Sequence, residues 1–192
     1  MIDYARVSAK PIQEDSSPSV VTAIRTIADT VKGGEAISLS MLEGSSKREY
    51  KVKDGVSLSF SGGIKLGVGD VIKYSVDAEG YIANIELYYS NSQNKLISNP
   101  ADNYNSIDRL CRLAYGEVVK NSNGCLEMEM TYDGNSKIER YAISNMRTII
   151  ISEDRTGINA EVGTSSSIAP GDKIIIYSRY LRNNLIIAYK EA

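Results

Sequence analysis

Two short segments of this chain combine residue types that bind phosphate or form nucleophiles elsewhere. Gly67-Val68-Gly69-Asp70 has two close glycines, but neither a third glycine nor a Gly-Lys-Ser/Thr follows, and no helix is predicted after it. Ser92-x-x-Lys95 has the spacing of the serine and lysine of serine β-lactamases, whose two further motifs are absent from this sequence. The simpler interpretations are a loop that turns into a strand and a polar linker.

Acidic residues are grouped at two other places. Asp102 to Asp108 is similar in spacing to part of a calcium loop, but Tyr104 replaces a ligand and Ile107 stands where glycine must make the turn. Glu127 and Glu129 lie on the polar face of one predicted strand, whereas glycoside hydrolysis needs two carboxylates across a cleft. We interpret the first segment as a loop and the second as a solvent-exposed strand face.

The composition removes most catalytic chemistry. The 192 residues contain no His and no Trp, one Phe and 13 Tyr. Without histidine, the common triads, general bases and most zinc or copper sites are excluded. The sequence predicts no catalytic, cofactor-binding or metal-ligating residue, no cofactor, and a protein that is not an enzyme.

Cys111 and Cys125 are the only two thiols, which is too few for a disulfide framework. They could pair if their Cα atoms came within about 7 Å of each other. The alternative is two reduced and mostly buried side chains. The sequence leaves both alternatives open.

Basic and aromatic side chains offer two candidate binding surfaces. Lys47, Arg48, Lys51 and Lys53 are interrupted by Glu49 and form either a solvated edge or a weak contact with an acidic polymer. A set of tyrosines predicted to be exposed could form a platform for a sugar or a peptide, although tyrosines in strands usually pack across neighbours. This set comprises Tyr81, Tyr88, Tyr89, Tyr177, Tyr180 and Tyr189.

Charge and hydropathy limit the partners. The formal net charge is −2 and the pI is about 5.3, whereas a nucleic-acid binder usually has a basic stripe and a high pI. No run of about 18 apolar residues is present, so no membrane span is predicted in this chain. Residues 1–19 lack the basic and then apolar layout of a signal peptide.

These residues are positioned by elements that occur twice. Residues 43–50 match 133–141, and residues 69–74 match 171–177, in the same order. Period-2 alternation in 37–41 and 126–130 predicts strands with one buried face, followed by Glu-Gly or Asp-Gly hairpin turns. One extra residue before the second turn predicts a bulge, and further extra residues lie near 153–164.

Two segments are less clearly patterned. Residues 20–30 fit a helical face, but they are rich in Val, Ile and Thr, and their counterpart around residue 118 is strand-like, so we predict a strand. Asn99-Pro100 could begin a short helix with Ile107, Leu110, Cys111 and Ala114 on one face. We expect one or two helical turns there at most.

The predicted fold class is therefore mainly β, with two tandem small β-barrel units, SH3-like or OB-like, related by an internal repeat. Residues 1–97 form the first module with an N-terminal extension, 98–112 the linker with at most a short helix, and 113–192 the second module.

Together, these short repeated sequence motifs resemble the repeated β-modules of clostridial cell-surface proteins that carry S-layer homology domains. The residues that carry the resemblance are Glu43-Gly44, residues 47–50, residues 68–74, residues 82–87, and residues 115–118 through 171–173. The resemblance covers most of residues 20–189. It implies an extracellular, cell-envelope location and a structural or display role, and it carries over no catalytic residue.

The resulting expectation is a non-catalytic structural or interaction module of a bacterial cell-surface or S-layer-associated protein. The expected partners are a cell-envelope polymer or other surface proteins, with no nucleic acid. Two alternatives are a virion or phage-tail structural module and a module that binds carbohydrate or cell-wall polymer.

Overall fold

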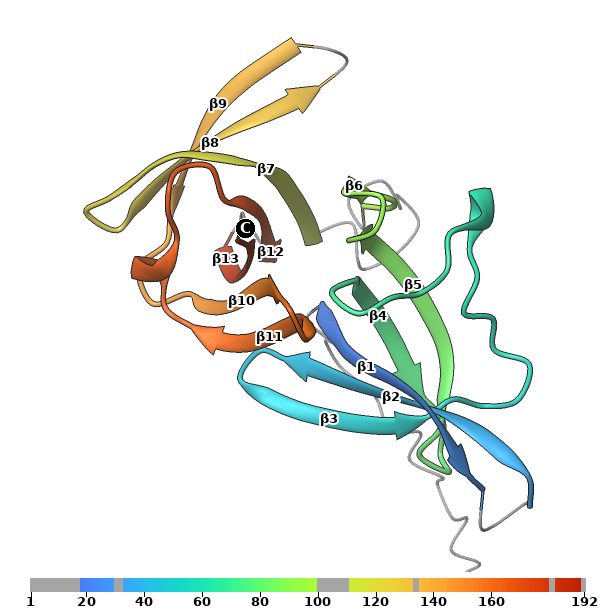
Figure 1. Cartoon of the computed structure of the whole chain (residues 1–192). Coiled ribbons are helices and arrows are strands. Elements are labelled where there is room, and N and C mark those ends of the chain that lie inside the picture. The colour runs from blue at the N-terminus through green and yellow to red at the C-terminus, as the bar shows by residue number, and fades with distance from the viewer. Residues whose placement is uncertain (1–17, 30–32, 100–110, 133–134, 180–181, 191–192) are drawn as a thin grey trace, which may run out of the picture.

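A computed structural model describes residues 18–29, 33–99, 111–132, 135–179 and 182–190. These residues form two sheets, one from each half of the chain, and contain no α-helix apart from short 3-10 turns. Figure 1 shows the two halves side by side, with β1 to β6 in blue to green and β7 to β13 in yellow to red. The prediction of a mainly β chain built from two tandem units is confirmed.

The first sheet has the strand order β3-β2-β1-β4-β5-β6, and its named strands all pair antiparallel. The loop between β3 and β4 contains a 3-10 turn, η1, at Ser61–Gly63. The strands are β1 (Ser19–Ala28), β2 (Glu35–Glu43), β3 (Ser46–Lys51), β4 (Val71–Val76), β5 (Ile82–Ser90) and β6 (Lys95–Leu96).

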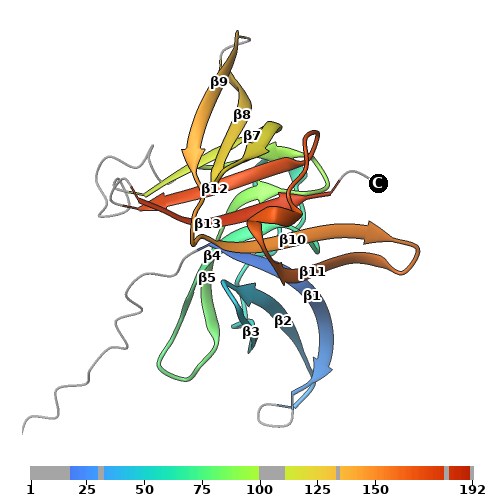
Figure 2. The ribbon, with the colours of Figure 1, turned by 90° about the vertical axis from the view of Figure 1, so that its left-hand side faces the viewer.

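The second sheet has the strand order β11-β10-β13-β12-β7-β8-β9, and a 3-10 turn, η4, lies at Ser165–Ser167. In Figure 2, the β8–β9 hairpin projects to one end of the molecule and the β4–β5 hairpin projects to the other. The strands are β7 (Cys111–Ser122), β8 (Cys125–Tyr132), β9 (Asn135–Ala142), β10 (Arg147–Asp154), β11 (Gly157–Gly163), β12 (Lys173–Arg179) and β13 (Arg182–Tyr189).

The internal repeat is present in the backbone. β1-β2-β3-β4-β5 corresponds in order and pairing to β7-β8-β9-β12-β13. In the first unit, the N–H of Val21 donates to the carbonyl oxygen of Asp70 at 2.9 Å, and the N–H of Gly69 donates back to Val21 at 2.8 Å. Val118, Asp172 and Gly171 make the same two bonds in the second unit, both at 2.9 Å. The two Gly-Asp motifs, at 69–70 and 171–172, therefore form equivalent turns between equivalent strands, and these turns are the Gly-Asp corners of the two units.

The growing gap between the repeats predicted extra residues near 153–164, and the structure shows that they belong to an added hairpin. β10 and β11 pair antiparallel around the turn from Asp154 to Gly157, and β10 also pairs parallel with β13. The first unit has only an isolated parallel bridge at this place, between Val52 and Ile82. Each described sheet curls but keeps two ends, so the described ladders form no closed barrel.

Each unit has its own apolar core. In the first unit the core includes Leu39, Met41, Ile72 and Ile82, all fully buried. In the second, Leu126, Met128 and Met130 are buried from β8, which confirms the predicted alternation of that strand. The alternation holds less well in β2, because Ile37 is 38% exposed at its outer end.

Three local predictions are decided by the structure. Of the segment 20–30, residues 20–28 lie in strand β1, as predicted, and pair with β2 throughout, whereas residue 30 lies outside the described residues. The predicted bulge before the second hairpin turn is wrong: β8 and β9 pair in unbroken register from Cys125 to Tyr132, so the one extra residue causes no break in the pairing. Two of the observed register shifts lie in the equivalent strands β1, between Val21 and Ala23, and β7, between Val118 and Lys120.

The predicted short helix also lies partly within the described chain. Ile107 and Leu110 are outside the described residues, whereas Cys111 and Ala114 belong to β7. This strand starts inside the segment predicted to be the linker. The helix prediction is therefore wrong for Cys111 and Ala114, because the pairing of β7 with β12 fixes both residues in extended backbone.

Candidate functional site at the junction of the two units

The two units share a third apolar core at their junction. Leu42 of β2 and Val20 of β1 are buried in the same cluster as Ile149 of β10 and Ile187 of β13. All four side chains are at most 1% exposed. Burial of this kind is favourable by about 25 cal/mol for each Å² of apolar surface removed from water, so this cluster joins the units energetically.

Three tyrosines form the polar side of this junction. The ring centroids of Tyr89 and Tyr189 are 4.9 Å apart, and those of Tyr89 and Tyr115 are 5.2 Å apart. The hydroxyls of Tyr89 and Tyr115 both donate to Oδ1 of Asn94, at 2.8 and 2.7 Å. Burial raises the pKa of all three phenols. The junction therefore holds neutral tyrosines with satisfied hydroxyls.

The repeat explains why two of these tyrosines meet. Tyr89 pairs with Val71, which follows Asp70, and Tyr189 pairs with Lys173, which follows Asp172. They are equivalent residues of the two units, each near the end of its closing strand. The units thus pack with their equivalent strand ends in contact.

The two Gly-Asp corners are stabilised by their aspartates in related ways. Asp70 accepts from the N–H groups of Gly67 at 2.8 Å and Asn91 at 2.7 Å. Burial raises the pKa of Asp70, and these two backbone hydrogen bonds oppose that shift. Asp172 accepts from the N–H of Ala169 at 2.7 Å and from Lys190 Nζ at 2.6 Å. Both aspartates therefore hold loop backbone in place.

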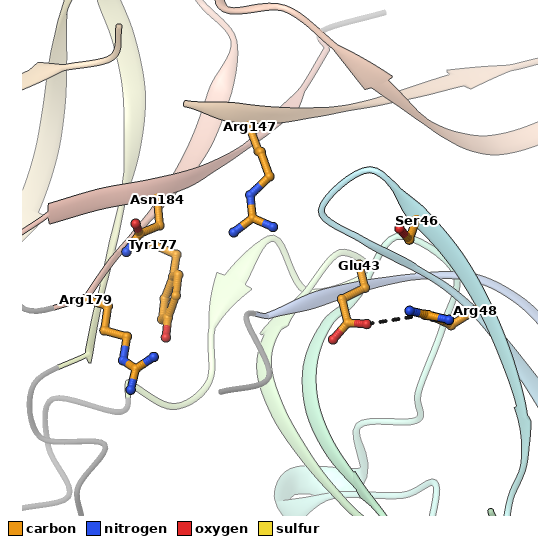
Figure 3. Close-up of a pocket in the computed structure, with 7 residues that line it drawn as sticks. All are labelled: Glu43, Ser46, Arg48, Arg147, Tyr177, Arg179 and Asn184. Atoms are coloured by element: carbon orange, nitrogen blue, oxygen red, sulfur yellow. Dashed lines mark ion pairs between the residues drawn. The ribbon is translucent and has the colours of Figure 1, made fainter. Parts of the chain in front are cut away.

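An open cleft of about 380 Å³ lies beside the shared core. Figure 3 shows that its walls come from both units: the β2–β3 hairpin on one side and β10, β12 and β13 on the other. Its lining is mainly polar and carries three guanidinium groups. The lining residues are Glu43, Ser46, Arg48, Arg147, Tyr177, Arg179 and Asn184.

Arg147 takes a central place in this cleft. Its side chain projects from the start of β10 into the space between Tyr177 and Glu43 (Figure 3). It lies directly against the turn at Gly44, where a Cβ atom would come within 2.8 Å of Arg147 Nη1. Gly44 also has a φ of +57°, in the left-handed region that glycine tolerates. The predicted hairpin glycine therefore has a second role, because it lets an arginine of the other unit approach the turn.

Two contacts fix the positions of further cleft residues. Glu43 and Arg48 form an ion pair across the β2–β3 hairpin at 3.8 Å. The buried hydroxyl of Tyr177 donates to Sγ of Cys111 at 3.2 Å. Tyr177 is thus a fixed wall of the cleft rather than an exposed platform.

The structure places the predicted motifs in turns and on strand faces. Gly69 has a φ of +86° in the turn before β4, and no helix follows, so the phosphate-loop geometry is absent from this described segment. Ser92 lies in the β5–β6 turn and Lys95 starts β6. Glu127 forms an ion pair with Arg140 at 3.0 Å on the β8–β9 hairpin. The candidate calcium loop at Asp102 to Asp108 lies outside the described residues.

The predicted basic cluster is largely paired with carboxylates. Lys51 lies 3.2 Å from Asp29, and Lys53 lies 2.9 Å from Asp77. Of this cluster, Arg48 alone lines the cleft. The sequence did not indicate Arg147 or Arg179, because they are distant in the chain from Arg48 and no local spacing connects them.

The prediction of an exposed tyrosine set is wrong for most of its members. Tyr88, Tyr89, Tyr177 and Tyr189 are buried, with exposed fractions from 1% to 9%. Their rings lie in the shared core, because the docking of the two units on each other buries the strands that carry them. Tyr81 is half-buried, and Tyr180 lies outside the described residues.

The two cysteines are both free, so the disulfide alternative is wrong. Cys111 is buried at the start of β7, and Cys125 is partly exposed at the start of β8. Within the described ranges, no group of three or more His, Cys, Asp or Glu residues is placed to hold a metal ion. The same residues include no helix with the length and apolarity needed to cross a membrane.

Comparisons with known proteins give little similarity. No protein-family model matches this chain, and no curated protein matches it. Among solved structures, the tetrameric p202 HIN2 is similar over 90% of this chain and 86% of its own, with 11% identity and a TM-score of 0.27. A TM-score of this size supports no inference about this chain.

Proposed function

We propose that this chain is a non-catalytic structural and interaction module whose two β-units act as one rigid body. The observation that carries this proposal is the shared core, in which residues of β1, β2, β4 and β5 are buried together with residues of β7, β10, β12 and β13. Two units joined only by a linker would move independently, whereas a substantial apolar interface fixes their orientation. A fixed orientation suits a spacer or a display module.

The test is whether the two units unfold together. Hydrogen exchange read by mass spectrometry in increasing denaturant reports peptides of the first and second sheets separately. We expect one midpoint for both. Ile149→Ala, which removes apolar volume from the shared core, should lower that midpoint in both units. Leu66→Ala removes volume from the core of the first unit alone, and it should still lower the midpoint of the second unit, because the two units unfold together. Two separate midpoints in the unsubstituted chain would contradict the proposal.

The proposed setting is the bacterial cell envelope, as part of a surface or S-layer-associated protein. This part of the proposal rests on the resemblance of the repeated sequence motifs to those of cell-surface β-modules. The test is an immunoblot of fractionated source cells with an antibody against this chain. We expect a band in the cell-wall fraction that is much larger than 21.0 kDa. A band near 21.0 kDa in the cytoplasm would overturn it.

A further inference from the structure

The cleft between the units carries a positive charge that the chain as a whole does not have. Its lining contains three arginines and one glutamate, so two positive charges are in excess there, whereas the net charge of the chain is −2. We propose that this cleft binds an acidic saccharide unit through one oxyanion group, a phosphate or a carboxylate. The inference rests on the proposed function, because it names a ligand for that interaction module.

The arginines suit an oxyanion better than lysines would. A guanidinium is planar and always charged, and it presents paired N–H donors that match the oxygens of a carboxylate or phosphate. Arg147 projects into the middle of the cleft, while Arg179 and Arg48 approach from opposite walls (Figure 3). Oxygens bound near Arg147 would therefore be close to cationic groups from both units.

The single carboxylate of the lining does not cancel this charge. Glu43 faces Arg48 at 3.8 Å, and 54% of the Arg48 side chain is exposed. An exposed pair at this distance contributes little and is readily exchanged. An entering oxyanion can therefore share Arg48 with Glu43 while Arg147 supplies the central contact.

The size and neutral groups of the cleft favour a saccharide unit over a nucleic acid. A volume of about 380 Å³ is near the lower end of small-molecule sites, which span about 300–1,000 Å³. Ser46 and Asn184 supply a hydroxyl and an amide for sugar hydroxyls. A nucleic-acid surface usually extends as a basic stripe with interleaved aromatics, whereas the tyrosine here, Tyr177, is 6% exposed.

The site exists only when the units are docked. Ser46, Arg48 and Glu43 belong to the β2–β3 hairpin of the first unit, and all other lining residues belong to the second. Gly44 permits this approach, because a side chain there would meet the Arg147 guanidinium. Ligand affinity should therefore depend on the same interface that holds the two units together.

The experiment is a calorimetric titration of the full chain with five probes: glucuronate, glucose 6-phosphate, neutral glucose, inorganic phosphate and a single-stranded oligonucleotide. We expect binding of at least one acidic sugar and no binding of glucose. Arg147→Gln should weaken that binding about tenfold or more, and Arg147→Lys should restore only part of it. Arg155→Gln removes an exposed arginine of the β10–β11 turn and serves as the charge-matched control. It should leave the affinity unchanged.

Five outcomes would overturn the inference. Inorganic phosphate that binds as tightly as glucose 6-phosphate would show that the sugar is not recognised. Equal losses in Arg147→Gln and Arg155→Gln would show that only net charge matters. Tighter binding of a single-stranded oligonucleotide, lost in Arg147→Gln, would assign the cleft to nucleic acid. If no probe binds while both units still share one unfolding midpoint, this inference fails and the rigid-module proposal stands. Separate unfolding midpoints for the two units would overturn both this inference and the rigid-module proposal.

Discussion

The hydroxyl of Tyr189, in the last strand of the second unit, donates a hydrogen bond of 2.8 Å to the carbonyl oxygen of Gly69, 120 residues earlier in the first unit. Gly69 belongs to one of the two Gly-Asp corners, and Tyr189 pairs with the residue that follows the other corner. The repeated corner of one unit is thus tied directly to the closing strand of its counterpart.

Removing this hydroxyl should weaken the junction without altering its packing. In Tyr189→Phe the ring stays in the shared core, but the carbonyl of Gly69 loses its partner in a buried setting. We expect a loss of about 1–3 kcal/mol in the free energy of unfolding, measured by denaturant titration. Tyr81→Phe, at the far end of the β4–β5 hairpin, is the control. Equal effects of the two changes would show that the junction bond contributes nothing specific.

The junction should also limit the stability of the protein at high pH. Tyr89, Tyr115 and Tyr189 have a pKa raised above the ordinary 10.0 by burial. The folded state keeps these protons where the unfolded state releases them, so their contribution is complete below pH 10.0 and declines as the pH rises beyond it. We expect tyrosinate absorbance to show these three groups ionising together with unfolding. Ionisation of all tyrosines near pH 10.0 with the fold intact would contradict this.

Gly116 should be needed for close packing in the second unit. A Cβ atom there would lie 2.2 Å from the carbonyl oxygen of Glu129 and 2.7 Å from Cγ of Met128. Gly116→Ala would therefore force β7 and β8 apart, at a cost of about 1–3 kcal/mol. Thermal unfolding measures this cost. Gly67→Ala is the matched control, since its nearest contact is 3.8 Å away and its backbone is not left-handed.

The two thiols should react at different rates in the native protein. Cys125 is partly exposed, whereas Cys111 is buried beneath the hydroxyl of Tyr177. Alkylation followed by peptide mass spectrometry should modify Cys125 first and Cys111 only slowly, and denaturant should equalise them. Cys125→Ser should leave only the slow reaction. A mass indicating loss of both thiols as a disulfide before any alkylation would contradict the free state.

Much of the fold could be predicted because strands and turns depend on residues that are close together in the sequence. The alternation of Leu126, Met128 and Met130 with two glutamates predicts a strand with one buried face, and the structure buries that face. The matching segments 69–74 and 171–177 predicted equivalent positions in the two units, with a loop that turns into a strand at the first of them, since a turn depends on the conformational preferences of adjacent residues. The extra residues near 153–164 were recognised because the sequence offset between matching segments of the two units increases there. They form the β10–β11 hairpin.

The candidate site could not be predicted in this way. Arg48 and Arg147 are almost a hundred positions apart, and only the docking of one unit on the other brings them to one cleft. The same docking buries Tyr89 and Tyr189, which their local pattern had placed on the surface. The sequence by itself thus determined the strands, their turns and their repetition, because these follow from neighbouring residues. The tertiary structure alone decided which surfaces face each other, because that choice depends on apolar area contributed by both units at once.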